Sequence, residues 1–148
     1  LPRGKIADIA GLSLPPGHFL GRVGCFFAGC CYGKVCELPW AITFTHPQSL
    51  APLHMALHPT QLYHSLANLL IFLFLFFLRR IKSFDGQVFW LYILCYGVAR
   101  STIELFRGDY RGATVFETFS ISQVIGLGSA IVAVAMLIIL SKRSKASN

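Results

Sequence analysis

The sequence predicts an all-α fold, a polytopic membrane helical bundle with about three spanning helices plus a Gly-rich short or re-entrant segment. Of the 148 residues, 55% are hydrophobic and 13% are charged, whereas roughly 25% charged residues are typical of a soluble domain. The apolar residues gather in three blocks of about the 20 residues that a bilayer core requires, at 61–78, 88–106 and 121–140. We therefore interpret residues 1–148 as a single integral membrane domain.

The first predicted element is residues 15–33, a segment rich in Gly and Phe. It is too irregular for a plain spanning helix and too apolar for a free loop, so we expect a short or re-entrant segment. Non-helical backbone at membrane depth is stable only where it packs in protein or lines a wet cavity, and the glycines therefore indicate a cavity wall. The alternative is close helix packing through small residues. The glycines concerned are Gly17, Gly21, Gly24, Gly29 and Gly33.

Residues 34–60, which contain four prolines, follow as a predicted external loop. Basic residues then set the orientation of the three spans, because Lys and Arg collect on the cytoplasmic side of a membrane. Three of them follow the first block and three follow the last, namely Arg79, Arg80, Lys82, Lys142, Arg143 and Lys145. We expect a multi-pass protein with a cytoplasmic carboxyl terminus and with the stretch before residue 61 outside. The formal charge of +7 is then explained by the membrane, with no nucleic acid as a partner.

We expect no signal peptide at the beginning of the given sequence, because Gly, Pro and Asp interrupt any apolar run there. The first residue is Leu1 rather than Met. We therefore expect the carboxyl-terminal part of a longer chain.

The second apolar block carries four polar residues that a spanning helix ordinarily lacks. At 100° per residue, all four lie within about 80° of one another on one helix face. They are Tyr96, Arg100, Glu104 and Arg107. Buried charge in a bilayer is costly and indicates a functional site, and an arginine pair beside a tyrosine suits a phosphate group, with Glu104 orienting an arginine. The alternative is that Arg100 and Glu104 neutralise each other while Arg107 reaches the headgroups.

The first block opens with a polar patch at its outer end. Gln61, His64 and Asn68 share one helix face, and polar groups facing lipid are expensive, so we expect this patch to face the bundle interior. His58 precedes Pro59, which suits the first turn of a helix. A single His is more often structural than catalytic, and both roles stay open for His64.

Four cysteines lie within twelve residues, at Cys25, Cys30, Cys31 and Cys36. Their spacing lacks the Cys-x-x-Cys pair of zinc and iron–sulfur sites, so we favour a disulfide over a metal site. Four cysteines allow three pairings, which stay open. Cys95 is expected to be an inert core thiol.

The segment 21–33, Gly-Arg-Val-Gly-Cys-Phe-Phe-Ala-Gly-Cys-Cys-Tyr-Gly, resembles the signature of the bacterial phosphatidylglycerol:prolipoprotein diacylglyceryl transferase family. The resemblance continues in order through Pro39-Trp40 and His-Pro-Thr-Gln-Leu-Tyr at 58–63. It ends with two further motifs, at residues 96–100 and 104–107. It implies an enzyme of the bacterial inner membrane that moves the diacylglyceryl group of phosphatidylglycerol to the lipobox cysteine thiol of a prolipoprotein. The implied partners are that lipid, the lipobox segment and membrane lipids, and no metal or organic cofactor is required.

The resemblance also assigns roles to residues. Arg22 and Arg100 are the implied catalytic residues, since fixed arginines can stabilise a departing phosphate. The implied substrate-binding residues are Arg22, Gly24, Tyr96, Arg100, Glu104, Arg107, His58, Gln61 and Tyr63. The family usually has Asn at the positions of Cys25 and Ala28 and Glu at that of Cys30. These departures keep two alternatives open, a non-catalytic lipid-binding or assembly relative and a membrane thiol redox protein.

Overall fold

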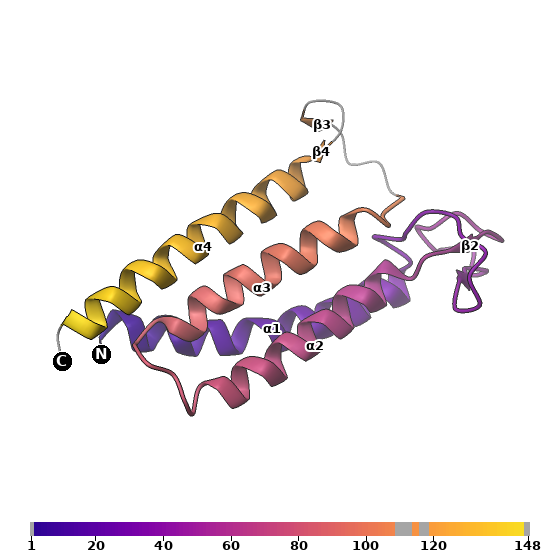
Figure 1. Cartoon of the computed structure of the whole chain (residues 1–148). Helices are drawn as coiled ribbons and strands as arrows, with labels where there is room; N and C mark the ends of the chain where they lie inside the picture. The colour runs from indigo at the N-terminus through magenta and orange to yellow at the C-terminus, as the bar shows by residue number, and fades with distance from the viewer. Residues whose placement is uncertain (1, 109–113, 116–118, 147–148) are drawn as a thin grey trace.

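The computed structural model describes residues 2–108, 114–115 and 119–146, which form four long helices and two short strand pairs. The helices lie along a common direction, with the two chain ends at one end of the bundle (Figure 1). They are α1 (Arg3–Ala28), α2 (Thr60–Leu78), α3 (Gln87–Glu104) and α4 (Ile121–Ala146). The antiparallel strand pairs are β1 (Ile42–Thr43) with β2 (Ala56–Leu57), and β3 (Thr114–Val115) with β4 (Phe119–Ser120). The all-α prediction is therefore confirmed.

The prediction of irregular backbone over residues 15–33 is wrong for most of that segment, because α1 continues through Pro15 and Pro16 as far as Ala28. Irregular backbone begins only at Gly29, which has a φ of 71°. Its N–H donates to the Phe26 carbonyl, and the next N–H donates to the Cys25 carbonyl. This is the Schellman pattern by which a left-handed glycine ends a helix.

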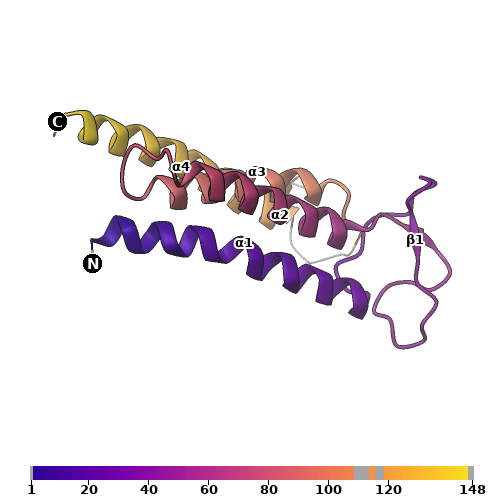
Figure 2. The same ribbon diagram turned by 90° about the horizontal axis from the view of Figure 1, so that it is seen from below.

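Packing of α1 against α2 and α3 stabilises this helix despite its two prolines and its glycines (Figure 2). The close approach is at Gly11, where an added Cβ would lie 2.7 Å from the Phe89 Cα. Gly17, Gly21 and Gly24 meet nothing within 4 Å in the described part of the chain. The three glycines therefore do not form the cavity wall or the close helix contact that the sequence predicts there.

The other three helices begin and end close to the predicted apolar blocks. Of the described helices, α2 and α4 have the length and hydropathy of membrane spans. An apolar core of Ile71 and Leu75 from α2 and Val88 and Tyr92 from α3 lies toward one end of the bundle. The polar face of α2 lies toward the other end, in its first two and a half turns.

Asp8 of α1 caps the beginning of α3. Its carboxylate is buried and accepts the backbone N–H groups of Gly86, Val88 and Phe89 at 2.9–3.2 Å. Lys82 donates to Asp8 at 2.7 Å and to Asp85 at 2.8 Å, and these two bonds raise the pKa of Lys82. A helix N-terminus is stabilised by negative charge, and here the charge comes from another helix.

Helices α3 and α4 make a close contact where a glycine of one helix faces a glycine of the other. An added Cβ on Gly97 would lie 2.5 Å from the Gly126 carbonyl oxygen, and one on Gly126 would lie 3.0 Å from the Gly97 oxygen. Gly126 and Ala130, two small residues about one turn apart on one face of α4, are both buried. At Gly126 that face is used inside the chain, against α3.

Candidate functional site

The interior of the bundle is polar where α2 begins, as the sequence predicts. Five consecutive inward positions of α2 are buried, at Thr60, Gln61, His64, Ser65 and Asn68. Three of them donate hydrogen bonds to backbone carbonyl groups of neighbouring segments. The Thr60 hydroxyl donates to the Cys31 carbonyl, and the Gln61 amide donates to the Cys30 carbonyl. The Ser65 hydroxyl donates to the Phe19 carbonyl. In the described part of the chain, the His64 Nε2 and Asn68 Oδ1 atoms have no hydrogen-bond partner.

Three arginines from separate segments converge on this interior. The charges of Arg22 from α1, Arg100 from α3 and Arg107 all act on the imidazole of His64. Arg100 also interacts with the charges of Arg22, Arg107 and Glu104. Among the residues that the structure describes, the cluster thus carries three positive charges against the one negative charge of Glu104, which is an arrangement suited to an anion.

Arg107 lies beyond the end of α3, so the predicted helix over 88–106 is slightly too long. Its backbone pairs with Gly33, and its buried side chain returns to Glu104, with 3.6 Å between Nη1 and Oε2. The two residues therefore meet through a turn after the helix, whereas the sequence predicts that they share one face of a longer helix.

Arg100 lines a cavity of about 240 Å³ between α3 and α4. One of its terminal nitrogens, Nη2, donates to the Ser122 hydroxyl at 3.3 Å. The other, Nη1, is buried and has no hydrogen-bond partner among the described residues. Tyr96 lines the same cavity, and so does Ser129. A buried guanidinium with an unused donor is able to bind a phosphate oxygen.

His18 of α1 lies beside two aromatic residues of α3, although no sequence pattern indicates a role for it. Its Nδ1 lies 2.9 Å from the Tyr92 hydroxyl, and its ring stacks on Tyr96 with 5.0 Å between centroids. His18 precedes Arg22 by one helical turn, so a helical assignment for α1 would have placed both on one face. The expectation of irregular backbone over residues 15–33 does not reveal this relation between His18 and Arg22.

The separate motifs of the sequence resemblance meet in space. Gly33 donates its N–H to the His58 carbonyl and pairs with Arg107. The Trp40 indole N–H donates to the Tyr63 hydroxyl at 2.9 Å, and the same hydroxyl lies 3.1 Å from the His58 Nδ1. An added Cβ on Gly33 would overlap the Cβ of His58. Glycine at this position therefore allows three chain segments to approach one another.

The predicted site residues fall into two groups in the structure. Those around the arginine cluster are Arg22, Tyr96, Arg100, Glu104 and Arg107. Gln61 lies at the beginning of α2 and donates to the Cys30 carbonyl. His58 and Tyr63 instead form an aromatic contact with Phe106 at the end of the bundle. Gly24 is exposed, and an added Cβ there would meet nothing within 4 Å in the described part of the chain, so this face of α1 lies apart from both groups.

The five cysteines all lie in the described part of the chain and form no disulfide, so the favoured disulfide is not found. Burial and the neighbouring thiols raise the pKa of Cys30. A nucleophilic or redox cysteine ordinarily has a lowered pKa. The direction of the shift at Cys30 is opposite to the one that such a cysteine shows.

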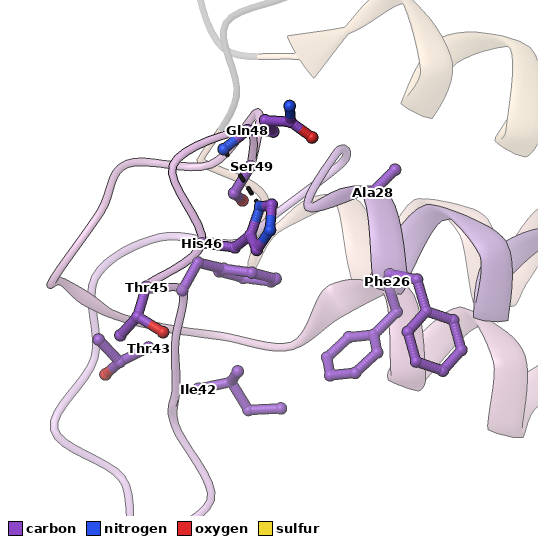
Figure 3. Close-up of a pocket in the computed structure, with 10 residues that line it drawn as sticks. Phe26, Ala28, Ile42, Thr43, Thr45, His46, Gln48 and Ser49 are labelled. Atoms are coloured by element: carbon purple, nitrogen blue, oxygen red, sulfur yellow. Dashed lines mark hydrogen bonds between the residues drawn. The ribbon is translucent and has the colours of Figure 1, made fainter.

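A second cavity, of about 470 Å³, lies where α1 ends against the loop that carries β1 (Figure 3). Phe26 and Ala28 line it from α1, and the β1 side contributes Ile42 and Thr43. The Gln48 backbone N–H donates to the His46 Nδ1 at 3.2 Å in this wall. None of the three arginines lines this cavity.

Comparison with known proteins identifies the family. The model of the family described as prolipoprotein diacylglyceryl transferase matches residues 1–139. Relatives named phosphatidylglycerol–prolipoprotein diacylglyceryl transferase are found in Clostridium tetani, with 41% identity over 88% of this chain and 51% of the relative, and in Dehalococcoides mccartyi, with 34% over 96% and 54%. The one in Geobacter sulfurreducens is 33% identical over 93% and 52%. The chain thus spans about half the length of these relatives, and it belongs to the prolipoprotein diacylglyceryl transferase family.

Proposed function

We propose that this chain supplies the phosphate-binding part of an enzyme that transfers a diacylglyceryl group from phosphatidylglycerol to the lipobox cysteine thiol of a prolipoprotein. The names of its relatives support the reaction. The observation that carries the proposal is the excess of positive charge among the described residues, three arginines against Glu104, with the buried Arg100 Nη1 atom unused by any of them. A phosphodiester carries one negative charge and offers the oxygens that such a donor binds.

In this reaction the arginines would have to stabilise negative charge that develops on the leaving group. The thiol gives up its proton, its sulfur bonds to the glyceryl carbon that bears the phosphate, and the carbon–oxygen bond breaks. The oxygen leaves with both bonding electrons as part of glycerol phosphate, so negative charge grows on the leaving group. Arg22 and Arg100 would hold this charge, as fixed donors do best in a site closed to water. Tyr96, Glu104 and Arg107 would position Arg100, and holding lipid and thiol together would supply much of the remaining rate.

The other expected binding residues have a separate role in this proposal. Gln61 fixes the loop after α1 through the Cys30 carbonyl. His58 and Tyr63 would bind substrate at the end of the bundle, beside Trp40. Gly24 would serve by presenting a bare helix surface to a substrate.

We further propose that the chain is one integral domain of the bacterial inner membrane, with the carboxyl terminus cytoplasmic. The apolar α2 and α4 support this. The 26-residue α1 is about 39 Å long at 1.5 Å per residue, longer than a hydrocarbon core of about 30 Å. Because α1 and α3 run beside α2 along the bundle (Figure 1), we propose four crossings instead of three.

The test is transfer of labelled diacylglyceryl from phosphatidylglycerol to a lipobox peptide, in membranes that contain the full natural reading frame. Arg100→Ala should lower the rate by about 10²- to 10³-fold, the usual effect of removing one oxyanion donor. Arg100→Lys should restore little, since a lysine lacks the planar fork. The matched control is Arg79→Ala, because Arg79 lies over the Phe76 ring, at 4.1 Å from its centroid, far along α2 from the cluster.

Unchanged transfer by Arg100→Ala would overturn the catalytic assignment. Lipid binding with no transfer by the unaltered protein would support the alternative of a non-catalytic lipid-binding relative. Phosphatidylglycerol binding should therefore be measured on the same membranes, together with the helical content of each variant.

A further inference from the structure

The end of α1 brings three cysteine sulfurs together. The Sγ atoms of Cys25, Cys30 and Cys31 all lie within 4.8 Å of one another, and each side chain is partly exposed. The other two cysteines, Cys36 and Cys95, lie outside this group. The three thiols thus form a distinct cluster.

The backbone holds this cluster in place. The Schellman turn at Gly29 reverses the chain so that the Cys30 N–H donates to the Cys25 carbonyl at 3.1 Å. Cys31 has a φ of 60°, a left-handed conformation that is unusual for a residue with a side chain. Such a conformation persists only where its surroundings enforce it, and it is common at ligand sites.

Two side chains of α2 enforce it here. The Thr60 hydroxyl donates to the Cys31 carbonyl at 2.7 Å, and the Gln61 amide donates to the Cys30 carbonyl at 2.8 Å. Both donors are fully buried. The loop therefore cannot swing away from Cys25 without breaking two hydrogen bonds to a packed helix.

This geometry is close to that of a metal bound by three thiolates. Metal–sulfur bonds of about 2.3 Å place sulfurs around one ion about 3.8 Å apart in a tetrahedral site and about 4.0 Å apart in a trigonal one. Small side-chain rotations would close the observed cluster to these distances. We propose that Cys25, Cys30 and Cys31 bind one soft, thiophilic cation, Zn²⁺ or Cu⁺. Thiolate is the ligand that both ions favour.

The proposal is independent of the diacylglyceryl transfer discussed above. Zn²⁺ would complete a tetrahedron with a water molecule, whereas three thiolates alone satisfy Cu⁺. A disulfide would use two of the three sulfurs and leave none of these sites. The number of thiols consumed therefore distinguishes the outcomes.

The experiment uses the full chain, reduced and reconstituted in lipid nanodiscs. Zn²⁺ and Cu⁺ are titrated separately, each against a colorimetric chelator, to obtain stoichiometry and affinity. We expect one ion per chain. Cys25→Ser, Cys30→Ser and Cys31→Ser should each weaken binding at least tenfold, while Cys36→Ser and Cys95→Ser serve as matched controls and should bind as the unaltered chain does.

A second measurement needs no variant. The reduced chain is treated with a thiol-alkylating reagent with and without the metal, and the labelled cysteines are identified by mass spectrometry. Protection of Cys25, Cys30 and Cys31, with Cys36 unprotected, would support the site. Binding that survives all three substitutions, protection of a different set, or no binding of either ion would overturn it.

Discussion

At the scale of single residues, the contrast between Asp8 and Asp85 shows how position decides what a carboxylate contributes. Both accept a hydrogen bond from Lys82 at nearly the same distance. Asp8 is buried and also accepts three backbone N–H groups at the beginning of α3, whereas Asp85 is exposed. The same ion-pair partner therefore serves a helix cap in one case and a solvent-screened surface pair in the other.

Asp8→Ala should destabilise the chain by on the order of 2 kcal/mol, because it leaves the α3 N-terminus uncapped and its donors unsatisfied. Asp85→Ala should leave the stability unchanged within error. Denaturation of each variant in detergent micelles, followed by circular dichroism, measures both. Equal stability of Asp8→Ala and the unaltered chain would contradict the proposed cap.

At the scale of helices, periodicity and hydropathy predict α2, α3 and α4 well, because each is a long apolar block with few interruptions. The inward polar face of α2 is predicted for the same reason, since Gln61, His64 and Asn68 repeat at helical spacing. The first helix, α1, is not predicted in this way, because Pro15, Pro16 and the glycines after them have poor helix propensity. The stability of α1 comes from contacts with α2 and α3, and helix propensity does not account for such tertiary contacts.

The site is predictable only to the extent that its residues share an element. Arg100 and Glu104 sit one turn apart on α3, so the sequence shows their relation. His18 and Tyr92 are joined across 74 positions, and no local pattern indicates such a pair. The cysteine cluster likewise depends on the left-handed residues after α1, which a spacing rule for metal knuckles does not describe.

The crossing of α3 and α4 gives a prediction at this same scale. Gly97→Ala should destabilise the bundle by about 1–3 kcal/mol, because the new methyl group meets the Gly126 backbone and pushes the helices apart. Gly128→Ala is the control on α4, since its Cβ would meet nothing within 4 Å among the described residues. That change should leave stability equal or slightly higher, as alanine favours a helix. Equal losses in both variants would show that the crossing is not tight.

At the scale of the whole molecule, positive charge is concentrated at one end. The chain ends and the α2–α3 connection lie together there (Figure 1). Eight of the 13 Lys and Arg residues belong to these segments, namely Arg3, Lys5, Arg79, Arg80, Lys82, Lys142, Arg143 and Lys145. The arginine cluster occupies the interior toward the opposite end, beside the loop that follows α1. In the orientation that we propose from the positive-inside rule, the basic end would face the cytoplasm and the proposed site would lie toward the outer leaflet.

This arrangement predicts which positions a membrane-impermeant maleimide reaches in intact cells. Single cysteines are placed in a chain whose native cysteines are replaced by serine. The protein that keeps Cys36 alone should label in intact cells, whereas Ser83→Cys and Ser141→Cys should label only after lysis. Arg3→Cys decides the number of crossings, because Arg3 begins α1 at the basic end. Labelling of Arg3→Cys only after lysis would support four crossings, and labelling in intact cells would mean that α1 does not cross and that three crossings remain.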